Sequence, residues 1–214
     1  MKGRPLREIF LEGFGFIRRA KGMLPLLTVA TALNFLLVPL STLLPYYIKV
    51  DHSGEAPDLA LVMAFFQGGI LVGRLVMSVI KGFKKKMAAV AISLYVIFLG
   101  YALVALTPSQ AFWFMSMSGT IMALCVPVAN VTLQTIIQTV VPAEMQGRVN
   151  SVVMALASAA TPVGMILSGA IVGFIRTANL FLTCAIVGAL IVTLSWLFTD
   201  VKHVENVELS ALDS

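Results

Sequence analysis

The chain has 214 residues, of which 59% are hydrophobic and only 12% are charged. Soluble domains are about half apolar and about one quarter charged, so a single buried core cannot hide this excess of apolar side chains. The composition therefore predicts a membrane protein, and because a span takes about 20 apolar residues there is room for about six or seven spans. Both cysteines, Cys125 and Cys184, stand alone in apolar runs, which excludes a disulfide-stapled secreted domain.

Residues 1–22 combine apolar residues at helical spacing with charged residues on the other face, which predicts a cytoplasmic amphipathic helix at the membrane interface. Six windows follow that are apolar on every face, whereas strands of a membrane barrel would alternate polar and apolar residues. We therefore expect a bundle of six transmembrane helices over residues 23–198. The windows are residues 23–48, 59–80, 87–106, 111–141, 149–175 and 180–198, and residues 199–214 are expected to be a cytoplasmic tail.

Basic residues between the windows predict the orientation, because Lys and Arg beside spans are retained on the cytoplasmic side. Of the 15 basic residues, Lys49 and Arg176 fall on one side, Arg74 lies within a span, and the others collect on the opposite side. We therefore expect an integral protein of the cytoplasmic (plasma) membrane with both termini in the cytoplasm. Despite the net charge of +5, nucleic-acid binding is not expected, since these residues line helix ends where lipid headgroups meet them. The cytoplasmic set is Lys2, Arg4, Arg7, Arg18, Arg19, Lys21, Lys81, Lys84, Lys85, Lys86, Arg148 and Lys202.

Dividing the six windows into two triplets reveals an internal repeat of glycines. The second helix of the first triplet contains Gly69 and Gly73, and the second helix of the other contains Gly169 and Gly173. Small residues four positions apart let another helix backbone approach closely, so all four glycines are expected to pack helices together.

Prolines also occupy corresponding places in the two triplets, with Pro39 and Pro45 in the first window and Pro127 in the fourth. They either bend helices beside a binding site or serve ordinary helix packing, and for Pro127 we expect packing. Two three-helix units of opposite topology are a common building block of transporters. The expected fold class is therefore an all-α membrane protein, a six-helix bundle made of two inverted three-helix repeats.

Ionisable residues inside the windows are rare, because a charge in hydrocarbon costs several kcal/mol. Arg74 is the one case, and either a functional role or snorkelling of its long side chain to the interface explains it. No Asp or Glu lies within a window. We therefore expect no cofactor, and if a proton gradient drives transport, this chain carries no evident coupling carboxylate.

Amide side chains recur every fourth residue in the fourth window, at Asn130, Gln134 and Gln138. This spacing places them on one stripe of the helix, which must face protein or a watery cavity. Neutral amides can hydrogen-bond a substrate without the desolvation cost of a charge, and an interhelical clamp is the alternative. We expect Asn130 and Gln134 to line a substrate site, with Asn34 and Gln67 as further candidates, and Gln138 to be structural.

The connection between the fourth and fifth windows contains Glu144 and Arg148, four residues apart. The two side chains can pair with each other at the start of the next helix or bind a neighbouring segment. Together with Arg74 they are candidates for a cytoplasmic gate or latch. His52 and His203 lie in polar segments, and we expect both to be solvated rather than catalytic or metal-bound.

These features resemble the major facilitator superfamily, in particular the C-terminal half of its macrolide-efflux and siderophore-exporter branch. The loop signature of that family survives only as Gly73, Arg74 and the basic run of residues 81–86, without its aspartate. The residues that carry the resemblance form three groups. They are Leu6, Glu8, Glu12, Gly13, Phe16, Ile17 and Arg18; then Pro127, Asn130, Leu133, Thr135, Gln138, Val141, Pro142, Glu144, Gly147, Arg148, Val149 and Ser151; and finally Thr161, Pro162, Gly164, Ser168 and Gly169.

The resemblance implies alternating access by two six-helix bundles that rock about a central site. Since six helices are expected here, a second bundle is needed, either another copy of the chain or a separate N-terminal half. Amphipathic drugs or similar small molecules are the expected substrates. The alternative is a truncated or non-transporting membrane protein that acts as a binding or assembly partner. An intramembrane enzyme is not expected, because the windows offer neither a nucleophile with a histidine base nor paired carboxylates.

Overall fold

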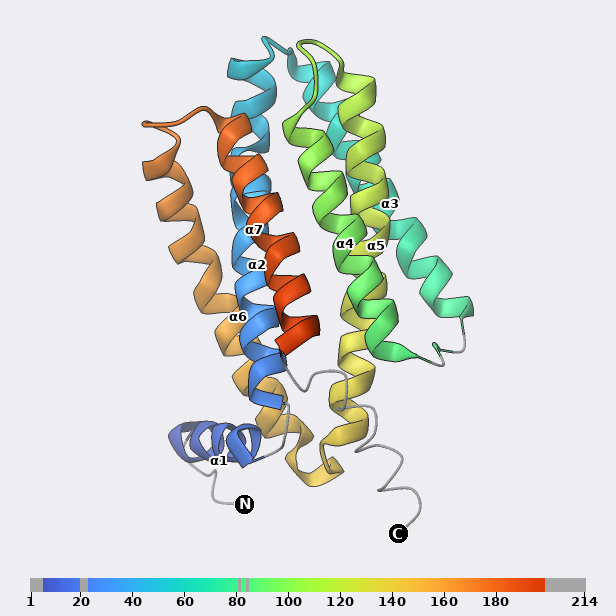
Figure 1. The fold of residues 1–214 in the computed structure, drawn as a ribbon, viewed down its shortest axis with the longest axis vertical. Coiled ribbons are helices and arrows are strands. Elements are labelled where there is room, and N and C mark those ends of the chain that lie inside the picture. The colour runs from blue at the N-terminus through green and yellow to red at the C-terminus, as the bar shows by residue number, and fades with distance from the viewer. Residues whose placement is uncertain (1–5, 20–22, 81, 84, 199–214) are drawn as a thin grey trace.

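The computed structural model describes residues 6–19, 23–80, 82–83 and 85–198, with side chains from residue 12 onward. The expected tail of residues 199–214, His203 and the basic residues Lys2, Arg4, Lys21, Lys81, Lys84 and Lys202 lie outside the described residues. Within them the structure is helical and without strands (Figure 1). The elements are α1 (Leu6–Arg19), α2 (Met23–Tyr46), the π-helical turn η1 (Tyr47–Asp51), α3 (Ala56–Val79), α4 (Lys86–Ala105), α5 (Phe112–Val140), α6 (Ala143–Ile171) and α7 (Thr177–Phe198).

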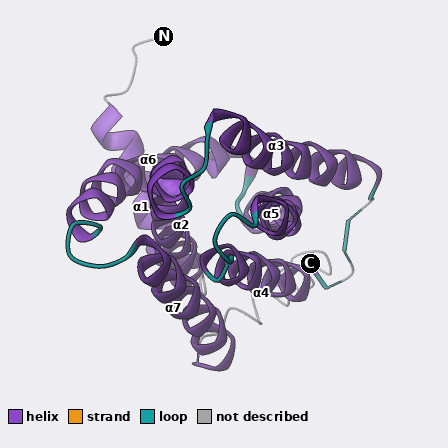
Figure 2. Cartoon of the chain, turned by 90° about the horizontal axis from the view of Figure 1, so that it is seen from above, coloured by secondary structure: helices purple, strands orange, loops and turns teal. Residues whose placement is uncertain are grey.

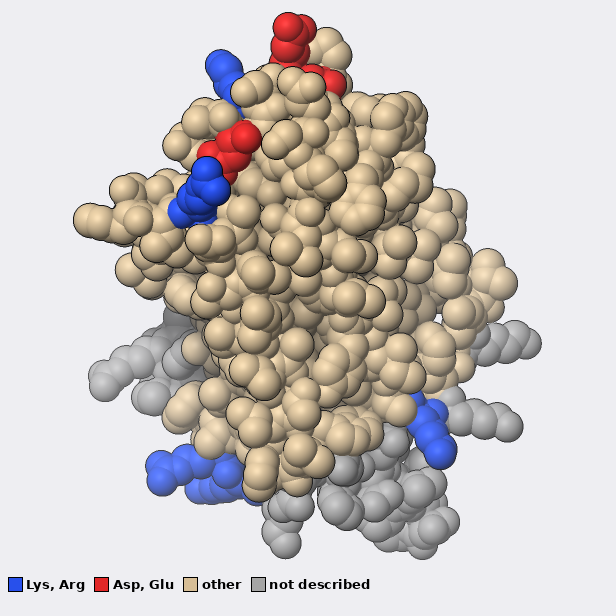
Figure 3. Space-filling view, turned by 45° about the horizontal axis from the view of Figure 1, so that its top comes forward, with Lys and Arg blue, Asp and Glu red and all other residues tan. Residues whose placement is uncertain are grey.

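Six of the described helices, α2 to α7, are long and apolar enough to cross a membrane. This confirms the prediction of an all-α six-helix membrane bundle. On the face seen in Figure 3, charged side chains gather toward the two ends of the molecule, with a broad uncharged band between them. Helix α1 runs across one end of the bundle, beside the start of α6 (Figure 1).

The main contacts between spanning helices follow one sequence: α3 packs on α5, α5 on α4, α4 on α7, α7 on α2, and α2 on α6. The bundle is therefore an open arc with α3 and α6 at its two edges, as the view along the helices shows (Figure 2). The first triplet is α2, α3 and α4, and the second is α5, α6 and α7. The set of contacts stays the same when each helix is exchanged with its counterpart, that is α2 with α5, α3 with α6 and α4 with α7. Each of these contacts also joins one triplet to the other, so the two repeats are interlocked rather than stacked.

The core of the arc lies between α2, α4, α5 and α7. Its largest buried side chains are aromatic, and the rings of Tyr101 and Phe181 lie 5.5 Å apart between centroids. Tyr47 in η1 lies 5.1 Å from Phe181, and its hydroxyl donates to the carbonyl oxygens of Val104 and Ala105 at 3.3 and 3.0 Å. These bonds occupy carbonyls at the end of α4 that have no partner within the helix. Tyr47 thereby fixes η1 to the end of α4.

The start of α3 is set by a capping box, in which the backbone N–H of Glu55 donates to an Asp58 carboxylate oxygen at 2.8 Å. Pro57 lies in the first turn, where its missing N–H costs nothing. Helix α3 therefore begins three residues before the predicted window.

The connection between α5 and α6 is shorter than predicted. We expected residues 142–148 to link two helices, but α6 begins at Ala143, and Val141 and Pro142 alone separate it from α5. Proline ends the first helix because it lacks a donor, and its fixed φ suits the start of the second. Helix α6 has 29 residues and is about 44 Å long, which exceeds the hydrocarbon thickness of about 30 Å.

His52 was expected to be solvated, and this prediction is wrong. The side chain is 6% exposed, and its ring lies 4.5 Å from Tyr47 and 6.4 Å from Phe112 between centroids. Burial lowers the pKa of the imidazole, against smaller opposing effects of the Asp51 charge and a hydrogen bond with the backbone of Pro108. The turn η1 extends α2 to Asp51, and His52 follows it directly, so its ring packs against Tyr47 and Phe112.

Candidate functional site

The two edge helices of the arc are the least buried. Over an apolar stretch of 18 residues, the buried share is 17% in α3 and in α6, against 33 to 44% in the other spanning helices. Leu71 and Leu75 on α3 and Ile166 on α6 are 59%, 58% and 72% exposed. Apolar faces of this size must be covered by lipid or by other helices.

A cavity of about 310 Å³ lies on the open side of the arc, between α2, α5 and α6. Asn34 from α2 and Asn130 and Gln134 from α5 all line it, with Met154 and Ala157 of α6 opposite. The four-residue spacing of Asn130 and Gln134 turns both amides toward the same side of α5. The structure thus brings together three of the four residues that the sequence singled out as substrate-lining.

The fourth residue, Gln67, lines a neighbouring cavity of about 470 Å³ between α2, α3, α5 and α6. Asn34 lines this cavity as well, so it lies at the junction of the two. Phe66 and Met122 make much of the remaining surface apolar, and Thr161 joins from α6. Both volumes fall in the range of small-molecule sites. Thr161 was not predicted as a lining residue, because helix spacing alone does not show that α6 faces α2 here.

Hydrogen bonds within the helices determine which polar groups of the lining remain available to bind a ligand. The Thr161 hydroxyl donates to Ala157 O at 3.3 Å, and the Ser41 hydroxyl donates to Val38 O at 2.9 Å. Asn34 Nδ2 donates to Ala30 O at 2.9 Å, which engages one of its amide hydrogens and leaves its carbonyl as an acceptor. The amides therefore supply most of the hydrogen-bonding capacity of an otherwise apolar surface.

A third, smaller cavity of about 230 Å³ adjoins Gln134 at the α5–α6 junction. Gln138, Gln146 and Asn150 also line it. Gln146 Nε2 donates to the backbone oxygens of Gln138 and Val141 at 3.0 and 3.2 Å, which ties the start of α6 to the end of α5. The sequence analysis missed Gln146 because it assigned residues 142–148 to a connection, and it did not single out Asn150, which lies at the start of the window that follows. Their spacing of four residues was the available signal.

Arg148 pairs with Glu12 of α1 and also donates to Met145 Sδ on its own helix at 3.4 Å. Its Nη1 lies 2.5 Å from Glu12 Oε2, and the two side chains are 30% and 42% exposed. An added Cβ on Gly13 would lie 2.6 Å from Arg148 O, so α1 touches the α6 backbone directly at this point. Of the two pairings that the sequence allowed, the structure has the one with a neighbouring segment, and Glu144 is exposed. The part that Glu144 and Arg148 play as a gate or latch stays a prediction.

The predicted glycine contacts divide into two classes. A Cβ on Gly69 would lie 2.7 Å from Thr120 O, and one on Gly73 would collide with Leu124 O and lie 3.1 Å from Pro127 Cγ. These glycines and Pro127 therefore lie where α3 crosses α5. On α6, Gly169 has nothing within 4 Å of an added Cβ, and Gly173 has only Ala170 O, at 3.5 Å. The expected packing role of Gly169 and Gly173 is thus not present within this bundle, where Gly164, against Val38, makes the corresponding contact.

Arg74 follows Gly73 on α3 and is exposed at the edge of the arc. Its role at a gate stays a prediction.

A comparison of the sequence with protein families matches the Major Facilitator Superfamily over residues 24–212. The chain belongs to the major facilitator superfamily. It is 26% identical over 199 residues to macrolide efflux protein A of Streptococcus pyogenes, an alignment that covers 92% of this chain and 48% of that protein. It is also 26% identical over 155 residues to macrolide efflux protein A of Enterococcus faecalis, covering 72% of this chain and 48% of that protein. The resemblance to the macrolide-efflux branch is confirmed.

The chain spans about half the length of the curated relatives it matches. None of the solved structures matches it. Membership of this family and six helices long and apolar enough to cross a membrane identify an integral membrane protein.

Proposed function

We propose that the chain is one six-helix bundle of a facilitator-type exporter, which moves amphipathic small molecules across the membrane by alternating access together with a second six-helix bundle. The observation that carries this proposal is the pair of amide-bearing cavities on the open side of the arc. Both cavities have walls from α2, α5 and α6, the larger one also from α3, and both lie on the open side of the arc. A second bundle that faced this side would enclose them.

The lining favours amphipathic and largely uncharged substrates. Asn34, Gln67, Asn130 and Gln134 offer donors and acceptors, whereas the remaining surface is mostly aliphatic or aromatic. None of the described residues that line either cavity is ionisable. Such a site recognises shape and a few hydrogen bonds, which suits molecules that partition into lipid.

The orientation follows from the basic residues. The end of the bundle that holds α1 and the Glu12–Arg148 pair is the cytoplasmic end in this proposal, with both termini on that side of the plasma membrane. Arg74, Glu144 and Arg148 would then act as a cytoplasmic gate or latch. No cofactor is needed, and a driving proton would bind outside the spans described here.

The second bundle is either another copy of this chain or a separate N-terminal half. The test is drug accumulation in cells without other exporters, with a macrolide as the probe. The chain would be expressed alone and together with the N-terminal half of a macrolide efflux relative. Lower accumulation with the chain alone supports a homodimer, and lower accumulation only on co-expression supports a split pair. Unchanged accumulation in both, with the chain present in the membrane, would contradict the exporter and leave a non-transporting assembly partner.

The amide site has its own test in Asn130→Leu. This change removes a donor and an acceptor from the cavity wall, and a missing hydrogen bond to a buried substrate group changes affinity by about 0.5–1.5 kcal/mol. We expect an altered ranking of exported compounds with unchanged membrane insertion. Asn179→Leu, on the exposed start of α7 and outside all described cavities, is the matched control. Equal rankings in the two variants would remove Asn130 from the site.

A further inference from the structure

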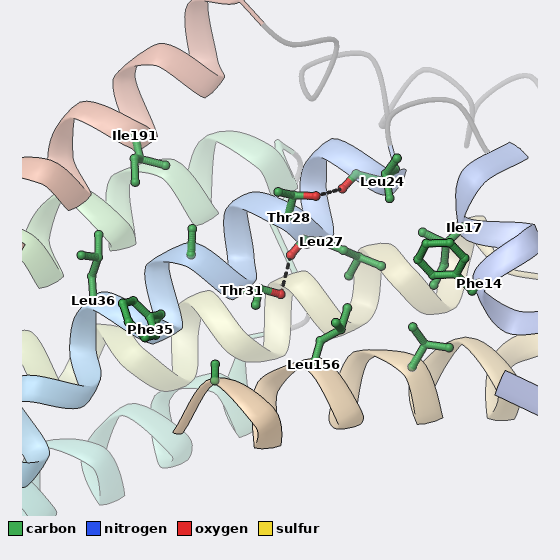
Figure 4. Close-up of a pocket in the computed structure, with 13 residues that line it drawn as sticks. Phe14, Ile17, Leu24, Leu27, Thr28, Thr31, Phe35, Leu36, Leu156 and Ile191 are labelled. Atoms are coloured by element: carbon green, nitrogen blue, oxygen red, sulfur yellow. Dashed lines mark hydrogen bonds between the residues drawn. The ribbon is translucent and has the colours of Figure 1, made fainter. Parts of the chain in front are cut away.

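A largely apolar groove lies beside the amide cavities, between α1, α2, α6 and α7. It has a volume of about 580 Å³ and follows α2 from Leu24 to Leu36. Figure 4 shows its side chains, with Leu156 of α6 on one side and Ile191 of α7 on the other. Phe14 and Ile17 of α1 close one end.

The groove offers a ligand no free hydrogen-bond donor. Its two hydroxyl groups both bind their own helix, Thr28 donating to Leu24 O at 2.9 Å and Thr31 donating to Leu27 O at 2.8 Å (Figure 4). A polar or aqueous occupant would lose hydrogen bonds there, whereas a hydrocarbon chain would not. Phe14 and Leu24 are 42% and 39% exposed in the unfilled groove, so apolar surface is available for burial.

The length of the groove matches one lipid leaflet. The 12-residue step from Leu24 to Leu36 corresponds to about 18 Å along the helix. One leaflet is half of the hydrocarbon thickness of about 30 Å. The groove therefore reaches from the end of the bundle at α1 to about mid-membrane.

Positive charge lies at the mouth of the groove. Arg18 and Arg19 form the last turn of α1 and are exposed. Arg18 directly follows the lining residue Ile17 and lies one helical turn from Phe14, and Arg19 follows it, so the last turn of α1 brings two positive charges to this end of the groove. The nearest acidic side chain on α1, Glu12, is paired with Arg148. Arginine recognises phosphate through paired hydrogen bonds.

We propose that this groove is a binding site for an anionic phospholipid, with an acyl chain lying along α2 between α6 and α7 and the phosphate at Arg18 and Arg19. The site is distinct from the amide cavities, although Leu27, Thr31 and Leu156 line both this groove and the amide cavity of α2, α5 and α6. It does not depend on the proposed export, because the lipid would bind the bundle whether or not the chain transports anything.

The test is native mass spectrometry of the purified chain in micelles that contain equal amounts of phosphatidylglycerol and phosphatidylcholine with identical acyl chains. We expect the protein to retain phosphatidylglycerol in preference. Ala32→Phe, which fills the groove, should lower the retained phosphatidylglycerol by about tenfold, because it displaces one or two methylene groups of buried contact. Ala155→Phe, at an exposed position of α6 outside all described cavities, should leave retention unchanged.

The charge is tested separately. In the double variant Arg18→Gln and Arg19→Gln, phosphatidylglycerol and phosphatidylcholine should be retained equally, whereas Arg176→Gln at the opposite end should keep the preference. Ala32→Leu, with a smaller side chain, should give an intermediate loss and guards against misfolding of the phenylalanine variant. Equal retention of the two lipids by the unchanged protein would overturn the proposal. The proposal would also be overturned if Ala32→Phe changed the oligomeric state but not lipid retention, because the groove would then bind another protein chain and not a lipid.

Discussion

Alanine at Gly69 and alanine at Gly169 should have opposite effects on stability, although their sequence spacing predicts the same packing role for both. At Gly69 an added Cβ would lie 2.7 Å from Thr120 O and 3.0 Å from the Cβ of Ala123. Because the first of these is backbone, it cannot rotate away. Helices α3 and α5 would have to separate by about 0.7 Å to restore an ordinary contact of 3.4 Å.

Overpacking of this kind costs about 1–3 kcal/mol. Gly169 has open space around it and lies within a helix, where alanine is more favourable than glycine by about 0.5–1 kcal/mol. We therefore expect the free energy of unfolding to fall for Gly69→Ala and to stay level or rise for Gly169→Ala. The two variants should differ by about 1.5–4 kcal/mol.

The assay is unfolding of the purified protein in mixed micelles of a mild detergent and dodecyl sulfate, followed by far-ultraviolet circular dichroism. Gly73→Ala and Gly173→Ala provide a second pair: Gly73 is packed against the backbone of α5, whereas Gly173 lies just beyond the end of α6 with ordinary space around it, so only Gly73→Ala should lower the free energy of unfolding. Equal losses at Gly69 and Gly169 would refute the reasoning, because the distinction between a packed and an unpacked glycine would then have no energetic meaning. A loss at Gly169 alone would indicate that this face is covered by another bundle.

Two further predictions concern the ends of the bundle. Charge reversal at Glu12 or Arg148 should weaken the docking of α1 on α6, which amide hydrogen exchange in α1 would report as faster exchange. The double reversal restores an opposite-charge pair and should recover about 0.2–1 kcal/mol, as is usual for partly exposed pairs. As a control, Glu144→Arg should show no such coupling to Arg148. For His52, burial lowers the pKa in the folded state, so the unfolded chain binds more protons near and below its pKa of about 6.5. The contribution of His52 to stability is complete above about pH 6.5 and is lost as the pH falls through the folded-state pKa. A His52→Phe variant should therefore show a weaker fall in the free energy of unfolding over this pH range. An identical pH profile for the variant and the unchanged protein would contradict the burial of a neutral His52.

The helices were predictable because hydrophobicity alone determines them. Windows of about 20 apolar residues leave a chain no other way to satisfy its backbone in lipid. The edges were less predictable, as α6 shows. Residues 142–148 are polar and follow a proline, which is typical of a connection, yet a proline at a helix start is equally compatible with those residues being helical.

The candidate site was predictable where residues share one helix and not where they come from different helices. The spacing of Asn130 and Gln134 placed them on one stripe, and the structure puts both on one cavity. That Asn34 faces them, or that Arg148 binds Glu12, depends on how helices pack. Glycine spacing likewise shows that a helix has a flat face, but not whether another helix meets it, which is why Gly69 and Gly169 differ.

The interlocked triplets have a consequence for the synthesis of the protein. Since the main contacts of α2, α3 and α4 are all made with α5, α6 or α7, the first three helices enter the membrane before any of their lasting neighbours exist. They remain in the lipid as separate helices until α5 is inserted and packs between α3 and α4. Assembly therefore begins when α5 packs on α3 and α4, continues as α6 packs on α2, and finishes when α7 fills the place between α4 and α2. A ribosome that stalled after the third helix would leave three stable spans and no tertiary structure.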